Sequence, residues 1–278
     1  KSIDKNIIKK IYVGGGTPTS LDYTMLEKLL KVIENCFLSE NLVEYTFEAG
    51  REDSLDFDKL KLLKKYNVTR ISLNPQTFNE KALKAMGRIQ NNENLLDLYT
   101  KAKDLGFVIN MDFILGLLYD DVNNTEKNLE ILRQLQPDNI TFHTLSIKKG
   151  SKYSQQYDKG NFKENIAEKQ MQLIKKWTFQ NNYRPYYLYR QKNILNNMEN
   201  IGYCRDIPSR YNIVINEELE SIIGFGMTAN SKIIKDDIIK YTNYKNLRDY
   251  SEKLDEIIKR KVEIINGWTK EKRRIQVG

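Results

Sequence analysis

Several short strings in this chain combine glycine with polar residues in a way that suits the binding of a polar ligand. Gly14-Gly-Gly-Thr-Pro-Thr19 follows a short apolar run. Three successive glycines let a ligand approach the backbone closely and reach its N–H groups. A tight turn that needs positive φ is the alternative interpretation. Because no Gly-Lys-Ser/Thr follows and the spacing is not GxGxxG, the string predicts neither a P-loop nor a dinucleotide site.

Five further side chains could take part in the same chemistry, and each also has a simpler interpretation. Glu48 and Gln76 follow apolar runs and could be ordinary surface residues, while Arg88 could cap the end of a helix. Asp112 lies inside an apolar run, where a carboxylate is costly to bury without a partner. It is therefore either a site residue or half of a structural ion pair. His143, the sole histidine, could be a core residue with satisfied hydrogen bonds.

The elements that must position these residues follow from the hydrophobic pattern. Short β-branched or aromatic runs begin near residues 11, 43, 68, 108 and 140, and amphipathic stretches at helical spacing lie between them. This alternation predicts an α/β fold with parallel strands joined by right-handed crossovers. Ligands of such folds bind at the carboxyl ends of the strands. The candidate residues follow those ends, so we expect them to meet at one rim.

The pattern loosens in the last third of the chain. A tyrosine-rich run at 183–190 precedes a polar loop, the runs 211–215 and 222–225 favour strands, and 247–265 favours a charged amphipathic helix. We therefore expect two domains, an α/β domain at 1–182 and an α+β extension at 183–278.

Composition limits the classes of function. Lys and Arg number 45 against 37 Asp and Glu, which gives a net charge of +8, but the charges are spread along the chain. Stacking aromatic residues do not alternate with them, which argues against nucleic-acid binding. No apolar run is long enough to span a membrane and no leader is evident, so we expect a cytoplasmic protein. Two cysteines, Cys36 and Cys204, and one histidine make a metal site within the chain hard to assemble.

Taken in order, these strings resemble the radical S-adenosylmethionine (SAM) family of oxygen-independent coproporphyrinogen III oxidases, in particular its coproporphyrinogen dehydrogenase branch. The glycine string alone is shared with haem-chaperone relatives, whereas the Asn-Pro-Gln-Thr and Tyr-Arg-Gln-Lys stretches point to this branch. The resemblance covers residues 10–232 and rests on Tyr12–Thr19, Phe47–Arg51, Arg70–Thr77, Met86–Arg88, Gly106–Asp112, His143–Lys148, Tyr187–Lys192, Glu199–Tyr203 and Gly224–Lys232.

The resemblance implies a partial (β/α) radical SAM barrel that lacks its first strand and its cluster loop, followed by an extension that closes the site. In this family the glycine string meets the methionine end of SAM, and the Gly224–Ala229 loop would close the far side. The catalytic side chains stay unassigned. The SAM-binding residues that it implies are Gly15, Gly16, Thr17, Glu48, Gln76, Arg88, Asp112 and Ser146.

The implied activity of the full-length protein is the oxygen-independent conversion of coproporphyrinogen III to protoporphyrinogen IX in haem biosynthesis. In this family a [4Fe–4S] cluster reduces SAM, and the 5′-deoxyadenosyl radical takes hydrogen from a propionate that then loses carbon dioxide. An electron donor such as a flavodoxin or ferredoxin is a further implied partner. A basic rim for the acidic tetrapyrrole would come from Arg51, Lys148, Lys149, Arg190 and Lys192.

One departure from the family affects the chemistry. The CxxxCxxC string that ligates the cluster is expected upstream of the glycine string, and the 13 residues before Gly14 contain no cysteine. We therefore expect a fragment that is inactive alone, with the cluster ligands upstream. Two alternatives stay open. One is a haem-binding chaperone built on the same barrel, and the other is a scaffold that has lost the cluster loop.

Overall fold

The chain folds as two compact units, Ile8–Tyr211 and Asn212–Gly278, the latter together with Lys1–Ile7. All eight SAM-binding residues predicted from the sequence belong to the first unit. The computed structural model describes residues 4–147, 152–157, 165–191, 194–234 and 237–275.

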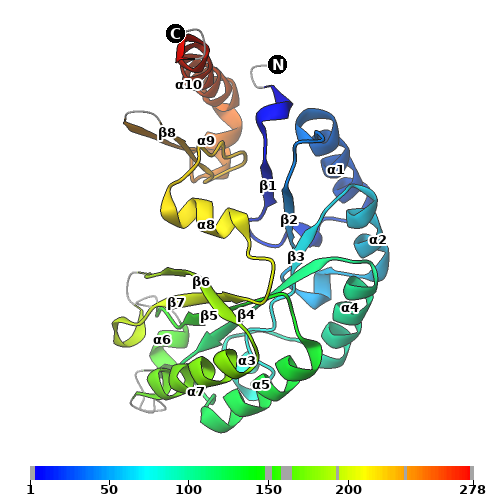
Figure 1. Ribbon diagram of the computed structural model, residues 1–278, viewed down its shortest axis with the longest axis vertical. Helices are drawn as coiled ribbons and strands as arrows, with labels where there is room; N and C mark the ends of the chain where they lie inside the picture. The colour runs from blue at the N-terminus through cyan, green and yellow to red at the C-terminus, as the bar shows by residue number, and fades with distance from the viewer. Residues whose placement is uncertain (1–3, 148–151, 158–164, 192–193, 235–236, 276–278) are drawn as a thin grey trace. The chain divides into compact units, whose positions relative to one another are not determined.

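The first unit is built on a seven-stranded sheet with the order β1-β2-β3-β4-β5-β7-β6. The first five strands are parallel, and β7 is antiparallel to both of its neighbours. The sheet curls, as Figure 1 shows, and the predicted α/β alternation is confirmed. The strands are β1 (Lys10–Val13), β2 (Glu44–Glu48), β3 (Arg70–Ser72), β4 (Val108–Leu115), β5 (Asn139–Thr144), β6 (Arg184–Tyr189) and β7 (Asn200–Cys204).

Helices lie along the outer side of the curled sheet (Figure 1). Four of the longer ones begin at an acidic or amide side chain that accepts a hydrogen bond from the first turn, and these capping residues are Asp22, Asp56, Asn91 and Asp121. The helices of this unit are α1 (Tyr23–Phe37), α2 (Phe57–Lys65), α3 (Glu80–Ala85), α4 (Asn92–Asp104), α5 (Val122–Leu135), α6 (Lys152–Tyr157) and α7 (Ile166–Gln180).

The two faces of the sheet differ in chemistry. Strand residues such as Phe47, Ile71 and Phe142 face the helices and are fully or almost fully buried in one continuous apolar core. Side chains alternate between the faces along a strand, so their neighbours in sequence point to the other, inner face. Those neighbours are polar on almost every strand. The sheet therefore has an apolar outer face, which stabilises the unit, and a polar inner face.

The first unit extends beyond the predicted domain boundary after residue 182. β7 pairs with β5, and β6 pairs with the other edge of β7. Both strands therefore belong to the same sheet as β1–β5. The compact units instead divide between Tyr211 and Asn212.

The predicted strand at 211–215 is wrong, because this segment forms helix α8 (Arg210–Glu217). The first two N–H groups of α8 donate to the carboxylate of Glu44 on β2, at 2.9 Å from Arg210 and 3.0 Å from Tyr211. A carboxylate at a helix N-terminus satisfies unpaired N–H groups and interacts favourably with the helix dipole. A residue far away in sequence thus overrides the local β-branched preference.

Glu44 also forms a buried ion pair on the inner face. Its Oε2 lies 3.4 Å from Nε of Arg70, and both side chains are at most 6% exposed. Arg70 donates to the side chain of Asn139 and to the backbone carbonyls of Ile207 and Pro208. The segment before α8 is therefore fixed against the amino ends of β2, β3 and β5.

The second unit contains a two-stranded antiparallel sheet and two helices. These elements are β8 (Asn230–Ile234), β9 (Ile238–Thr242), α9 (Leu247–Glu252) and α10 (Leu254–Ile275). The run predicted as a strand at 222–225 contributes only an isolated bridge between Ile222 and Lys232. Among the described residues, none of the helices combines the length and apolar character needed to cross a bilayer.

A buried carboxyl, Asp120, lies in the loop between β4 and α5 and is only 5% exposed. Burial raises its pKa to about 6, although hydrogen bonds with Thr77 and Asn79 act in the opposite direction. Because this pKa lies above the ordinary value of 3.8, the folded state binds the proton more tightly than the unfolded state. The contribution of Asp120 to stability is therefore lost as pH rises from about 4 through 6.

We expect Asp120→Asn to remove this pH dependence. Between pH 5 and 7.5 the free energy of unfolding of the wild type should fall by about 1.5 kcal/mol more than that of the variant. Urea denaturation of both proteins at the two pH values measures the difference. Identical pH profiles would show that the Asp120 carboxyl titrates normally in the folded protein.

Candidate functional site

The polar residues of the inner face form two layers along the strands. Glu44, Arg70 and Asn139, at the amino ends, are covered by the segment before α8 and are at most 5% exposed. Farther along the strands, toward the carboxyl ends, Glu48 and Asp112 are only partly buried. Ligands of parallel α/β sheets bind at this carboxyl end. The second layer is therefore the candidate site.

The glycine string forms the loop after β1 and approaches Glu48 at the end of β2. An added Cβ at Gly14 would lie 2.6 Å from the Tyr12 ring and 3.0 Å from the Glu48 carboxyl, so this position needs glycine. Gly15 has a φ of +119°, and its N–H donates to Glu48. Added Cβ atoms at Gly15 and Gly16 would meet nothing within 4 Å. These two residues thus present open backbone to a ligand.

The loop is anchored from behind by contacts with the segment after β2. The hydroxyl of Thr19, which is fully buried, lies 2.7 Å from that of Ser54. Nζ of Lys59 donates to the carbonyls of both residues, at 2.7 and 2.8 Å. Thr17 precedes this anchor and is half-buried. These bonds fix the backbone of the loop, whereas the glycines stay exposed.

Glu48 is a partly buried carboxylate with no ion pair among the described residues. Burial raises its pKa, and the charge of Asp112 raises it further, whereas the hydrogen bonds from the Tyr12 hydroxyl and the Gly15 N–H lower it. The two carboxyls therefore influence one another across the inner face. A cationic ligand placed beside them would relieve the cost of keeping both ionised.

Asp112 is held by groups from two strands, β4 and β5. Nδ2 of Asn110 donates to its Oδ1 at 2.7 Å, and Nε2 of His143 lies 3.7 Å from its Oδ2. Burial opposes ionisation, but the nearby His143 imidazole, together with Asn110 and Thr141, outweighs it and lowers the pKa of Asp112. The structural ion-pair interpretation thus has a partner, His143. At 22% exposure the Asp112 side chain still reaches solvent.

The polar network continues onto β6, where the sequence had suggested no site residue. The Tyr189 hydroxyl lies 3.0 Å from Nδ1 of His143, and the Tyr187 hydroxyl lies 3.1 Å from that of Thr141. The two tyrosine rings are parallel, with centroids 6.1 Å apart. An added Cβ at Gly202 on β7 would overlap the Tyr187 ring, so this glycine lets the ring lie flat against the sheet.

Gln76 and Arg88 lie in the segment between β3 and β4, and both form hydrogen bonds with backbone groups of neighbouring segments. Gln76 has a φ of +65°, and its backbone bonds with that of Asp112 and Ile114 continue the sheet beyond β3. Arg88 donates from Nη2 to the carbonyls of Gly50 and Asn74, and burial lowers its pKa. Arg88 therefore joins the loops after β2 and β3.

Ser146 follows β5 and forms an isolated bridge with Ile194. Glu48 links three of the predicted residues, because it accepts a hydrogen bond from the Gly15 backbone and its carboxyl is affected by the charge of Asp112. Tyr12, Tyr187 and Tyr189, which belong to the same polar network, were not among the predicted site residues. The sequence signals for the β6 residues were the alternating tyrosines at 187 and 189 and the family-like stretch Tyr187–Lys192 that contains them.

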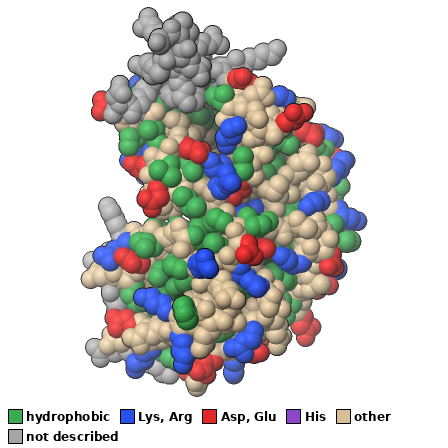
Figure 2. All heavy atoms as spheres, in the orientation of Figure 1, with side chains coloured by type: hydrophobic (Ala, Val, Ile, Leu, Met, Phe, Trp, Pro, Cys, Tyr) green, Lys and Arg blue, Asp and Glu red, His purple; other side chains and the backbone are tan. Residues whose placement is uncertain are grey.

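Of the predicted basic rim, two residues are described, and both are already paired. Arg51 forms an ion pair with Asp53, and Arg190 lies 3.3 Å from Glu199. The other three, Lys148, Lys149 and Lys192, lie outside the described residues. On the face shown in Figure 2, basic and acidic side chains are interspersed, as expected for solvated helix faces.

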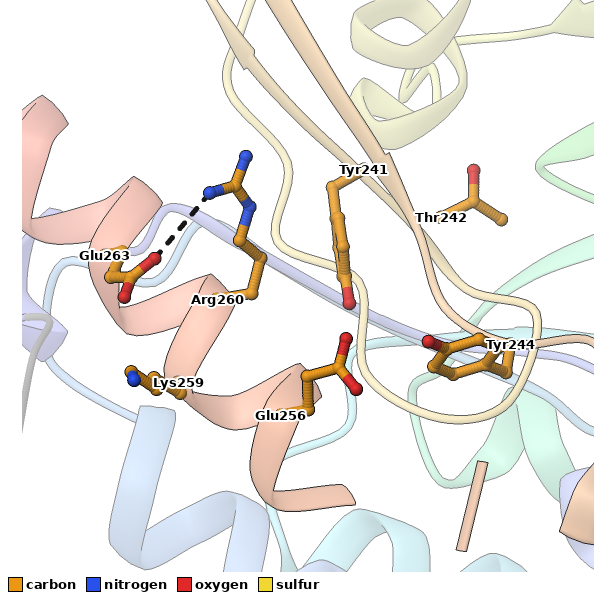
Figure 3. Close-up of a pocket in the computed structure, with 7 residues that line it drawn as sticks. All are labelled: Tyr241, Thr242, Tyr244, Glu256, Lys259, Arg260 and Glu263. Atoms are coloured by element: carbon orange, nitrogen blue, oxygen red, sulfur yellow. Dashed lines mark ion pairs between the residues drawn. The ribbon is translucent and has the colours of Figure 1, made fainter. Parts of the chain in front are cut away.

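The second unit contains a separate pocket of about 360 Å³ between β9 and α10 (Figure 3). Charged residues of both signs and two tyrosines line it, and Arg260 pairs with Glu263 at 3.6 Å. None of the predicted SAM-binding residues belongs to it. The Gly224–Ala229 loop also lies in this unit, and its Gly224 carbonyl accepts a hydrogen bond from Lys261.

The described residues do not fit an iron–sulfur cluster. Cys36 is exposed on α1 and Cys204 is buried on β7, and no group of three potential metal ligands occurs in the described part of the chain. Burial raises the pKa of the Cys204 thiol, which disfavours the thiolate that metal binding requires. By contrast, the open glycine backbone and the two neighbouring carboxylates fit a ligand that is cationic and has hydrogen-bonding groups, such as SAM.

Known proteins resemble this chain in sequence. The family model described as the radical SAM superfamily matches residues 1–134. The oxygen-independent coproporphyrinogen-III oxidase-like protein HemZ of Bacillus subtilis is 39% identical to this chain. The alignment covers 95% of this chain and 55% of that protein. The heme chaperone HemW of the same organism is 32% identical over 50% of this chain and 37% of that protein. This chain thus spans 55% of the first of these relatives and 37% of the second.

A solved structure supplies the fold comparison. The structure of coproporphyrinogen III oxidase from Escherichia coli, described as a radical SAM enzyme, matches with a TM-score of 0.70 and 20% identity, over 89% of this chain and 57% of that chain. This likeness confirms the predicted partial (β/α) radical SAM barrel. In sequence and in fold, the chain is therefore similar to radical SAM proteins that include the oxygen-independent coproporphyrinogen III oxidases and their homologues.

Proposed function

We propose that this chain is the SAM-binding part of a protein that converts coproporphyrinogen III to protoporphyrinogen IX without oxygen. One observation carries the proposal. Glu48 and Asp112 lie on the inner face of the sheet, beside the open backbone of Gly15 and Gly16, and Glu48 has no ion pair among the described residues. An amino-acid ammonium and ribose hydroxyls are groups that such carboxylates can bind.

In this proposal each predicted residue has a distinct task toward SAM. Gly15, Gly16 and Thr17 offer backbone groups to its methionine end, and Glu48 accepts from its ammonium group. Asp112 accepts from its ribose hydroxyls. Gln76, Arg88 and Ser146 border the nucleoside, with Arg88 also holding the loops after β2 and β3 in place.

Bound SAM would supply the radical that removes hydrogen from a propionate side chain of the substrate. The residues of this chain bind and orient SAM and exclude water from it. His143 and Tyr189 lie on the inner face next to Asp112 and can hydrogen-bond a substrate carboxylate. The full-length protein would draw electrons from a donor such as a flavodoxin or ferredoxin.

The proposal is tested first by binding. Isothermal titration calorimetry of the purified chain with SAM should give saturable binding of one molecule per chain. Reconstitution with iron and sulfide should give no cleavage of SAM, because only two cysteines are present in the chain. Absence of SAM binding would contradict the proposal for the cofactor site, and SAM cleavage would contradict our assignment of the cluster ligands.

The activity of the full-length protein has one rival, which the similarity to heme chaperone HemW supports. Anaerobic incubation of the full-length protein with coproporphyrinogen III, SAM and a reductant should yield protoporphyrinogen IX. Stoichiometric haem binding without any such turnover would favour the chaperone function instead.

A further inference from the structure

The Glu48 carboxylate is held by two donors from β1 and the loop that follows it. The Tyr12 hydroxyl donates to Oε1, and the Gly15 N–H donates to the same carboxyl group. Burial, followed by the charge of Glu48, raises the pKa of Tyr12, so its hydroxyl remains a protonated donor. One carboxylate oxygen is thus occupied by a neutral donor of the protein itself, and capacity remains for a ligand.

The Tyr12 ring is itself fixed by a residue almost two hundred positions away. The rings of Tyr12 and Tyr211 are stacked, with centroids 3.9 Å apart and an angle of 13° between their planes. The Cε1 atom of the Tyr12 ring also lies so close to Gly14 that an added Cβ there would be only 2.6 Å from it. The ring therefore has little freedom to rotate away from Glu48.

Tyr211 is positioned in turn by the first residue of the strand that ends in Glu48. Oε1 of Glu44 accepts from the Tyr211 N–H at 3.0 Å, and Oε2 of Glu44 pairs with Arg70. Glu44 and Glu48 are four residues apart on β2, so both side chains point to the inner face. A closed series of contacts leads from Glu44 through Tyr211 and Tyr12 to Glu48.

We infer that Tyr12 is a positioning residue for Glu48 and that Tyr211 supports it. The inference rests on the proposed binding of SAM at Glu48. The Tyr12 hydroxyl fixes the plane of the Glu48 carboxylate so that its free lone pairs point toward an incoming ammonium group. It also favours the ionised carboxylate, which is the form that binds a cation.

Tyr12→Phe removes the hydroxyl but keeps the stack with Tyr211, so it tests the hydrogen bond alone. In titration calorimetry of the purified chain with SAM at pH 7.5, we expect the dissociation constant to rise about tenfold, or about 1.4 kcal/mol. The pH at which affinity falls to half should also move upward, because the lost hydrogen bond no longer lowers the pKa of Glu48. A purely structural role for Tyr12 would not move this pH.

Two variants of Tyr211 separate the stack from the hydroxyl. Tyr211→Phe keeps the stack and should bind SAM as the wild type does. Tyr211→Leu removes the stacked ring while leaving the Tyr12 hydroxyl, and should weaken binding several-fold. This second variant also keeps the inference testable if Tyr12→Phe is poorly folded, which its thermal melting curve reports.

The outcomes distinguish this inference from the function on which it rests. Normal SAM affinity and an unchanged pH profile in Tyr12→Phe, with weakened binding in Glu48→Gln, would overturn the role of Tyr12 and leave the SAM site intact. Unchanged affinity in Tyr211→Leu would overturn the supporting role of Tyr211. Absence of SAM binding by the wild type would refute both the site and the inference.

Discussion

Replacing Glu48 with glutamine is expected to weaken SAM binding by about 100-fold, or about 2.7 kcal/mol. The change preserves the shape of the side chain and removes its charge. Glu48 has no ion pair among the described residues, so its charge is available to the ammonium group of the ligand. The substitution would remove that charge. Titration calorimetry with SAM at pH 7.5 measures the effect.

The pH profile gives this expectation a second readout. Because burial raises the pKa of Glu48, protonation should reduce SAM affinity of the wild type at a higher pH than for an ordinary carboxyl. Binding to Glu48→Gln should lack that transition. Glu130→Gln, which changes a half-exposed carboxylate on α5, is the matched control and should bind normally. Equal affinity in both variants would remove Glu48 from the site.

The second large effect concerns stability. Arg70→Met is expected to lower the free energy of unfolding by about 3–5 kcal/mol, because it leaves Glu44 buried without its cationic partner. It also removes the donors to the carbonyls of Ile207 and Pro208. Urea denaturation followed by circular dichroism measures the change.

A surface ion pair provides the control for Arg70→Met. Arg133 lies 2.7 Å from Glu130, but both side chains are more than half exposed. Arg133→Met should therefore cost no more than about 1 kcal/mol, since exposed pairs contribute little. If the two substitutions cost the same, the ion pair on the inner face contributes no more than an exposed one.

Much of the fold could be predicted because local patterns and tertiary structure agree. The apolar runs near 11, 43, 68, 108 and 140 correspond to β1–β5, and the amphipathic stretches between them correspond to the helices of the outer side. The exception at 211–215 has a non-local cause. The N-terminus of α8 is capped by Glu44, a residue more than 160 positions earlier, and no local pattern could reveal it.

The candidate site could be predicted only where its residues follow from local patterns. Glu48 and Asp112 follow from their places on parallel strands, whereas Tyr187 and Tyr189 depend on a shift in strand register. Between Pro185 and Tyr187 the pairing of β6 with β7 skips a residue, which reverses the face on which the later residues lie. Alternation alone gives no means of locating such a shift, so the side of the sheet was undetermined.

The overlap between position 202 and the Tyr187 ring also constrains how this protein can evolve. Any side chain larger than hydrogen at position 202 would displace the ring, and with it the hydroxyl that reaches Thr141. Selection that retains Tyr187 therefore also retains Gly202. If one of the two residues is replaced in a lineage, the other is no longer constrained. Across homologues the two positions should be inherited as a pair.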